Sequence, residues 1–278
     1  FCNKFLARFG VTTTYYDPSI GAGIAALIQD NTKIVYTESP GSLTFEVQDI
    51  RAIADEAHKR GCIVIIDDTW SSGVFFKPFE HGADVSVIAA TKYIVGHSDV
   101  MMGVITTTDE QWQQVRQSAS DLGANAGPDD VYLALRGLRT IGVRMRQHYE
   151  NGMKLAQWLQ ARPEVEAVLH PGLPEFPSHE LWKRDFTGAC GLFGVLLKPF
   201  PEKALAAMLD DLAYYGMGAS WGGFESLILL TDPAAIRVAT KERWETAGPT
   251  LRIHAGLEDI DDLIDDLEKG FERMNANA

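Results

Sequence analysis

The sequence predicts an α/β protein with two parts: a large domain built on a mostly parallel sheet, and a smaller α+β domain on its C-terminal side. In the first half of the 278-residue chain, short apolar segments alternate with segments of helical period, which favours a parallel sheet covered by helices. A long helical pattern follows, and beyond it strands and helices are mixed. We therefore expect domains at residues 1–140 and 141–278.

The strands expected in the first domain are short segments rich in β-branched or other apolar residues, bounded by turn-forming residues. They lie at residues 11–15, 33–37, 62–67, 84–89 and 103–107. The segment 62–67 is almost entirely apolar, as expected for a strand whose sheet has helices on both faces. Helices are expected at 24–28 and at 49–60, where apolar residues recur on one helical face.

The second half begins with a helical pattern from residue 129 to about 161, which predicts one helix or two that lead into the second domain. Beyond it, helices are expected at 202–215 and 259–274. Apolar segments predict strands at 191–197, 227–230 and 251–255. This mixture without regular alternation indicates an α+β arrangement.

The composition limits the classes of partner. The chain has 38 acidic and 25 basic residues and a formal net charge of −13, which disfavours nucleic acid or an anionic membrane as its main partner. No apolar stretch reaches the roughly 18 residues of a transmembrane helix, and no signal peptide is visible. The three cysteines form no CxxC pair and HExxH is absent, so we expect no metal site and a reducing, cytoplasmic location.

The first residues predict that the chain is part of a longer protein. There is no initiator Met, and apolar residues recur at helical spacing at Phe1, Phe5, Leu6 and Phe9. Gly10, which follows them, is suited to the C-terminal end of a helix. The chain thus opens inside a helix that exposes three phenylalanines, and we expect residues before Phe1 to be missing.

A lysine and an aspartate suggest the chemistry. Asp67 ends the apolar segment 62–67, and Lys92 lies in a loop of small residues after the next expected strand. A lysine can form a Schiff base with pyridoxal phosphate (PLP), and a carboxylate can hold its protonated pyridine nitrogen. The carboxyl end of a parallel strand is where ligands bind in open sheets. Asp68 is an alternative to Asp67, although neighbouring strand residues face opposite sides. Taken alone, Lys92 could also be a surface lysine.

Eight segments, read together, resemble the Cys/Met-metabolism family of PLP enzymes, which has the aspartate-aminotransferase-type fold. These segments are Glu38-Ser-Pro-Gly-Ser42, Ile66-Asp-Asp-Thr-Trp70, Ala90-Thr-Lys-Tyr93, Gly96-His-Ser-Asp99, Arg136-Gly-Leu-Arg-Thr140, Trp182-Lys-Arg-Asp-Phe-Thr-Gly188, Ser220-Trp-Gly-Gly-Phe-Glu-Ser226 and Leu251-Arg-Ile-His-Ala-Gly-Leu-Glu258. The resemblance covers essentially the whole chain. Within the family, Trp70 and Gly41-Ser42 are more similar to the bacterial cystathionine β-lyases than to the γ-synthases.

The resemblance implies a set of site residues. Those expected to bind PLP are Lys92, Asp67, Thr69 and Thr91. Those expected to bind the substrate are Arg252, Ser220 and Trp221, with the arginine fork on the substrate carboxylate. Lys92 would also be catalytic, since its amine can remove the Cα proton and later protonate the leaving sulfur.

The resemblance implies a carbon–sulfur lyase that splits L-cystathionine by β-elimination into homocysteine, pyruvate and ammonia, in methionine biosynthesis. It also implies a homo-oligomer, a tetramer in the family. Two alternatives stay within the family: a broader cysteine-S-conjugate β-lyase or cysteine desulfhydrase, and a γ-eliminating relative. A third is a non-catalytic binding or oligomer-forming module, because the family's upstream phosphate-binding loop has no counterpart in this chain.

Overall fold

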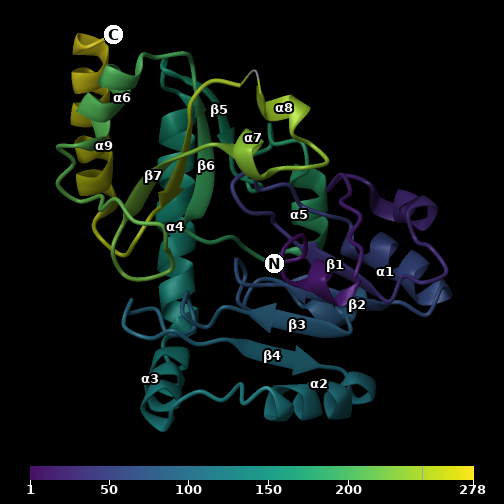
Figure 1. The fold of residues 1–278 in the computed structure, drawn as a ribbon. Helices are drawn as coiled ribbons and strands as arrows, with labels where there is room; N and C mark the ends of the chain where they lie inside the picture. The colour runs from purple at the N-terminus through teal and green to yellow at the C-terminus, as the bar shows by residue number, and fades with distance from the viewer. Residues whose placement is uncertain (246) are drawn as a thin grey trace.

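The computed structural model describes residues 1–245 and 247–278 (Figure 1). Within these residues the strands form two four-stranded sheets. Three helices lie between the two sheets along the chain, α2 (Asp109–Asp121), α3 (Pro128–Leu138) and α4 (Ile141–Gln160). In Figure 1, α4 extends from the first sheet, near the bottom of the view, along the second sheet above it. The helical pattern of residues 129–161 thus forms two helices.

The first sheet is mostly parallel, as predicted. Its strands, in spatial order, are β1 (Ile34–Glu38), β2 (Ile63–Asp67), β3 (Val85–Ile88) and β4 (Val104–Thr107). The first three are parallel and β4 is antiparallel to β3. In the register of the sheet, Asp67 lies between Glu38 of β1 and Val87 of β3. The carboxyl ends of three strands therefore meet at one edge.

Helix α1 (Ile50–Lys59) covers one face of this sheet. Asp49 caps it by accepting a hydrogen bond from the Ala52 N–H at 3.2 Å, and Gly61 follows it in the left-handed region at φ 67°. Its apolar face is buried against a short 3-10 helix, η2 (Gly21–Ala26), and against β1 and β2. The short 3-10 helices of this part are η1 (Leu6–Phe9) and η3 (Pro78–His81), and the longer helix α2 contacts β4.

The second sheet is antiparallel and belongs to the α+β part. Its strands, in spatial order, are β5 (Val165–Leu169), β6 (Leu192–Leu197), β8 (Thr250–His254) and β7 (Leu227–Thr231). The helices α6 (Glu202–Leu209) and α9 (Ile260–Ala276) pack against it together with α4, and these elements enclose the largest apolar cluster (Figure 1). The remaining helices are α5 (His179–Asp185), α7 (Pro233–Ile236) and α8 (Glu242–Glu245).

Two predicted elements were wrong. Residues 11–15 form no strand, because a β-branched pattern becomes a strand only where another strand pairs with it, and no described strand does so here. The helix predicted over 202–215 ends at Leu209. A few residues later, the backbone N–H groups of Ala213 and Tyr214 donate to the Asp266 carboxylate on α9 instead of to helix carbonyls. Strand β5 and helix α5 were not predicted.

The first turn of α4 holds the loop that contains Lys92. Arg144 is 7% exposed, and its guanidinium donates to the carbonyls of Tyr93 at 2.7 Å, Gly137 at 2.8 Å and Ile94 at 3.2 Å. Burial lowers the pKa of Arg144. The carbonyls of Tyr93 and Ile94 belong to irregular backbone, where no ladder would pair them, and that of Gly137 lies in the last turn of α3. Arg144 thus connects the helix to the loop that follows β3.

We expect Arg144→Lys to lower the free energy of unfolding by about 2–4 kcal/mol, because an ammonium cannot reach three carbonyls in the geometry of the guanidinium fork and buried acceptors are left unpaired. Urea unfolding of both proteins measures the change. Arg139→Lys, at an exposed position nearby, is the control and should change little. Equal stability of the Arg144 variant and the control would contradict this role.

Candidate functional site

The predicted site gathers at the carboxyl edge of the parallel strands. Asp67, the last residue of β2, is half-buried, and its Oδ1 accepts a hydrogen bond from the Thr69 N–H at 2.9 Å. The hydroxyl of Thr69 accepts in turn from the Ala89 N–H at 2.9 Å. The Lys92 N–H donates to the Ala89 carbonyl at 3.0 Å. A short chain of contacts thus connects the end of β2 to the lysine that follows β3.

Asp68 occupies a different environment from Asp67. It is 0% exposed, on the opposite side of the chain, and its Oδ2 accepts from the Gly73 N–H at 2.9 Å. Its Oδ1 has no hydrogen-bond partner among the described residues. Burial, above all, raises the pKa of Asp68 to about 8. Asp68 is therefore a buried and largely neutral carboxyl near pH 7, whereas the Asp67 side chain is the one within reach of a ligand.

Lys92 points toward the second part of the chain. Its Nζ donates to the Ser220 hydroxyl at 2.7 Å and lies 5.2 Å from the centroid of the Trp221 ring. Burial lowers the pKa of Lys92, and the charge of Arg252 lowers it further. A lowered pKa favours the neutral amine, the form that acts as a nucleophile or a base.

Arg252, which lies on β8, is the remaining residue of the cluster around the Lys92 amine. Its Nη2 donates to the Ala219 carbonyl at 2.7 Å and lies 3.3 Å from the Ser220 carbonyl. Burial lowers the pKa of Arg252. The structure thus brings together the predicted residues Lys92, Ser220, Trp221 and Arg252, which come from two loops and a strand far apart in the sequence.

Thr91 lies beside Lys92, but its hydroxyl is engaged by the main chain. Its Oγ1 accepts from the Met102 N–H at 2.9 Å and donates to the Met102 carbonyl at 3.2 Å. These contacts hold the loop after β3 against the start of the segment that leads to β4. The role of Thr91 in binding PLP stays a prediction.

The sequence did not reveal Arg144 or Gly222 as part of this arrangement. Arg144 could have been noticed as a charged residue within the apolar pattern of residues 129–161. Gly222 was quoted only as part of a motif, and a single glycine does not say which backbone it contacts. Its neighbour in space is the backbone of Lys92.

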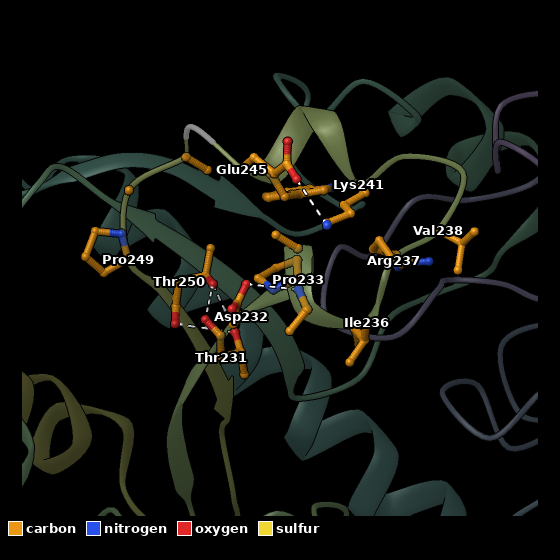
Figure 2. Close-up of a pocket in the computed structure, with 15 residues that line it drawn as sticks. Thr231, Asp232, Pro233, Ile236, Arg237, Val238, Lys241, Glu245, Pro249 and Thr250 are labelled. Atoms are coloured by element: carbon orange, nitrogen blue, oxygen red, sulfur yellow. Dashed lines mark hydrogen bonds and ion pairs between the residues drawn. The ribbon is translucent and has the colours of Figure 1, made fainter.

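The hollow drawn in Figure 2 lies elsewhere. It has a volume of about 710 Å³ and is lined by residues of β7, α7, α8 and the start of β8. Lys241 and Glu245 form an ion pair of 3.2 Å at one side of it. None of the predicted site residues lines it. The candidate site is therefore defined by contacts at the strand ends and not by this hollow.

Two further properties concern the described part of the chain. In residues 1–245 and 247–278, no helix combines the length and apolar character needed to cross a membrane. Over the same residues, no three His, Cys, Asp or Glu side chains gather in a way that could hold a metal ion.

The residues present fit PLP in two respects. Lys92 offers the cofactor's aldehyde an amine whose pKa is lowered. Asp67 offers its pyridine nitrogen a half-exposed carboxylate at the edge where ligands bind in open sheets. An opposite charge within a few ångströms favours the protonated nitrogen. Fold and site together define a PLP-dependent enzyme of the α/β type.

Comparison with known proteins agrees with this class. The model of the Cys/Met metabolism PLP-dependent enzymes matches residues 1–272, and the chain belongs to that family. It is 49% identical to the cystathionine beta-lyase of Escherichia coli and 47% identical to that of Salmonella typhimurium, over 99% of this chain and 70% of each relative. The structure of a cystathionine gamma synthase from Xanthomonas oryzae pv. oryzae superposes with a TM-score of 0.91, at 33% identity, over 99% of this chain and 72% of that one. The protein is a PLP-dependent carbon–sulfur lyase.

The state of Asp68 predicts how stability depends on pH. Its pKa is raised from 3.8 in the unfolded chain to about 8, so the folded state binds the proton more tightly. The stability that this proton contributes is fully present below about pH 4 and is lost as pH rises through about 8. Asp68→Asn keeps the shape without the charge, so we expect its unfolding free energy to fall less between pH 5 and 9 than that of the unchanged protein.

Urea unfolding across that pH range measures the difference. Asp30→Asn, in an exposed loop, is the matched control and should follow the unchanged protein. Parallel pH profiles for the Asp68 variant and the unchanged protein would show that Asp68 is ionised in the fold.

Proposed function

We propose that this protein catalyses the β-elimination of L-cystathionine, releasing homocysteine, pyruvate and ammonia with the uptake of one water. The observation that carries the proposal is the Lys92 amine, whose pKa is lowered and which lies between the Ser220 hydroxyl, the Trp221 ring and Arg252. Two relatives at 47–49% identity are named cystathionine beta-lyase, which supports the substrate.

Each residue of the site has a role in this reaction. When bound, PLP supplies an electron sink next to the substrate's α-carbon. Lys92 Nζ takes the Cα proton and later gives a proton to the sulfur that leaves from Cβ. Asp67 holds the protonated pyridine nitrogen, while Thr69 and Thr91 support the cofactor from the same strand edge.

The substrate-binding roles fall to the second part of the chain. Arg252 binds the substrate carboxylate, for which its planar fork is suited. Ser220 orients the Lys92 amine through the hydrogen bond of 2.7 Å. The Trp221 ring shields one side of that amine from water and leaves the other side to the substrate.

We also propose that the chain divides into domains at residues 1–140 and 141–278. The separate sheets and the start of α4 at Ile141 support this division. We further propose a homo-oligomer, a tetramer as the family implies, in a reducing cytoplasm. The three free cysteines, of which Cys62 and Cys190 are buried, support a reducing location.

The purified protein, supplied with PLP and cystathionine, should release pyruvate and homocysteine in equal amounts. Coupling pyruvate to lactate dehydrogenase and derivatising the thiols measures both products. The appearance of cysteine and 2-oxobutyrate instead would assign γ-elimination. A higher kcat/KM on cystine or cysteine than on cystathionine would assign a broader β-lyase or desulfhydrase.

Reduction with borohydride in the presence of PLP should attach the cofactor irreversibly to Lys92, since this amine is the one placed at the site. Peptide mass spectrometry locates the adduct. Lys92→Ala should lose both the adduct and pyruvate release, by ~10³-fold or more because it removes the proposed base and nucleophile. Lys154→Ala, which removes an exposed lysine on α4, is the control. A chain that takes up no PLP would instead be a non-catalytic binding module.

A further inference from the structure

The loop that carries Ser220 and Trp221 is held by side chains from β8. Residues 218–223 belong to no helix or strand, so no regular hydrogen-bond ladder fixes them. Arg252 binds the carbonyls of the first half of this loop, at Ala219 and Ser220. The second half is contacted by His254, which follows Arg252 by two residues and so projects from the same face of the strand.

His254 contacts the backbone of Gly222 and Gly223. Its Nε2 lies 3.1 Å from the Gly222 nitrogen and 3.2 Å from the Gly223 oxygen. One tautomer of the ring accepts from the Gly222 N–H and the other donates to the Gly223 carbonyl. Either tautomer attaches the ring to the same short stretch of backbone.

The ring itself is fixed in place. His254 is 1% exposed, its Nδ1 lies 3.5 Å from the Tyr93 hydroxyl, and its ring centroid is 5.1 Å from that of His148. The Tyr93 hydroxyl also accepts from the Gly191 N–H at 3.2 Å. Burial first, and then the neighbouring His148, lower the pKa of His254 to about 3. The ring is therefore neutral near pH 7.

Gly222 connects the fixed His254 ring to the backbone of Lys92. A Cβ at residue 222 would lie 3.0 Å from the Cα, Cβ and carbonyl carbon of Lys92, so the two backbones are in direct contact. Gly222 also has φ of 84°, a conformation that favours glycine. The contact leaves no room for a side chain.

We propose that His254 is a positioning residue for Lys92. Its ring holds the backbone of Gly222 and Gly223, and Gly222 packs directly against the lysine backbone. The same contact fixes the two preceding residues, Ser220 and Trp221, which touch the lysine amine. Lys92 is thus held at its backbone and at its amine by one loop, and β8 secures both halves of that loop.

The positioning can be tested without turnover. In the cofactor-free protein, acetylation of Lys92 by an N-hydroxysuccinimide ester, located by peptide mass spectrometry across a pH series, reports how readily its amine becomes neutral. We expect His254→Leu to raise the midpoint of this profile by about one pH unit, because a loosened loop admits water around the amine. His254→Gln offers an amide near the position of Nε2 and should keep the midpoint close to that of the unchanged protein.

His170 provides a matched control. It is likewise buried, at 0% exposed, and its Nδ1 accepts from a glycine amide, the Gly172 N–H at 2.9 Å. That glycine lies in the loop after β5 and does not touch Lys92. His170→Leu should lower thermal stability as His254→Leu does, but leave the Lys92 midpoint unchanged. A folded His254→Leu protein with an unchanged midpoint would overturn the proposal.

A second variant tests the same proposal in case His254→Leu does not fold. Gly222→Ala places a methyl group against the Lys92 backbone and should also move the midpoint, so an unchanged midpoint there counts equally against the proposal. Only the catalytic consequence, a fall in kcat of ~10-fold with little change in KM, rests on the proposed function. If the unchanged protein releases no pyruvate, the proposed function fails, while the acetylation profiles still decide the role of His254.

Discussion

The buried turn that carries Lys92 constrains the rest of the structure, because its peptide groups lie inside the protein without a ladder to pair them. Ala90, Tyr93 and Val95 are at most 1% exposed. Arg144 pairs the carbonyls of Tyr93 and Ile94 from one side. Helix α3 approaches so closely that a Cβ at Gly137 would lie 2.4 Å from two carbonyl oxygens of this turn. Helices α3 and α4 thus enclose this turn, and Arg144 on α4 supplies hydrogen-bond donors for its carbonyls.

At this turn, residues from the two parts of the chain come into contact. Strand β3 places the lysine at the carboxyl edge of the parallel sheet, and β8 of the antiparallel sheet supplies Arg252, which binds the loop that carries Ser220. Each part of the chain provides half of the candidate site. A lysine near an arginine, partly removed from water, has its charged form disfavoured, so the joining of the two parts also sets the chemistry of the amine.

Two buried ionisable groups near the candidate site have pKa values shifted toward their neutral forms. The pKa of His148 is lowered to about 4 and that of Asp68 is raised to about 8, in both cases chiefly by burial. Groups that would carry charge in water thus surround the site without placing unpaired charges in the core. The ionisable residues of the candidate site, Asp67, Lys92 and Arg252, are half-buried, and the buried guanidinium of Arg144 is paired with backbone carbonyls.

The elements with strong periodicity, such as the apolar strand β2 and the capped helix α1, could be predicted from the sequence alone. The sequence also placed Asp67 at the end of one strand and Lys92 in the loop after the next. Local pattern suffices there because burial on both faces, or on one helical stripe, dictates which residues can follow one another. Tertiary structure decided what local pattern cannot encode. It ended α6 at Leu209, and beyond it Asp266 of α9 accepts from the N–H groups of Ala213 and Tyr214. It left residues 11–15 without a partner strand among the described residues. It also brought Gly222 against Lys92 and His254 against Gly222, since such contacts join residues far apart in the chain and depend on how its two parts pack together.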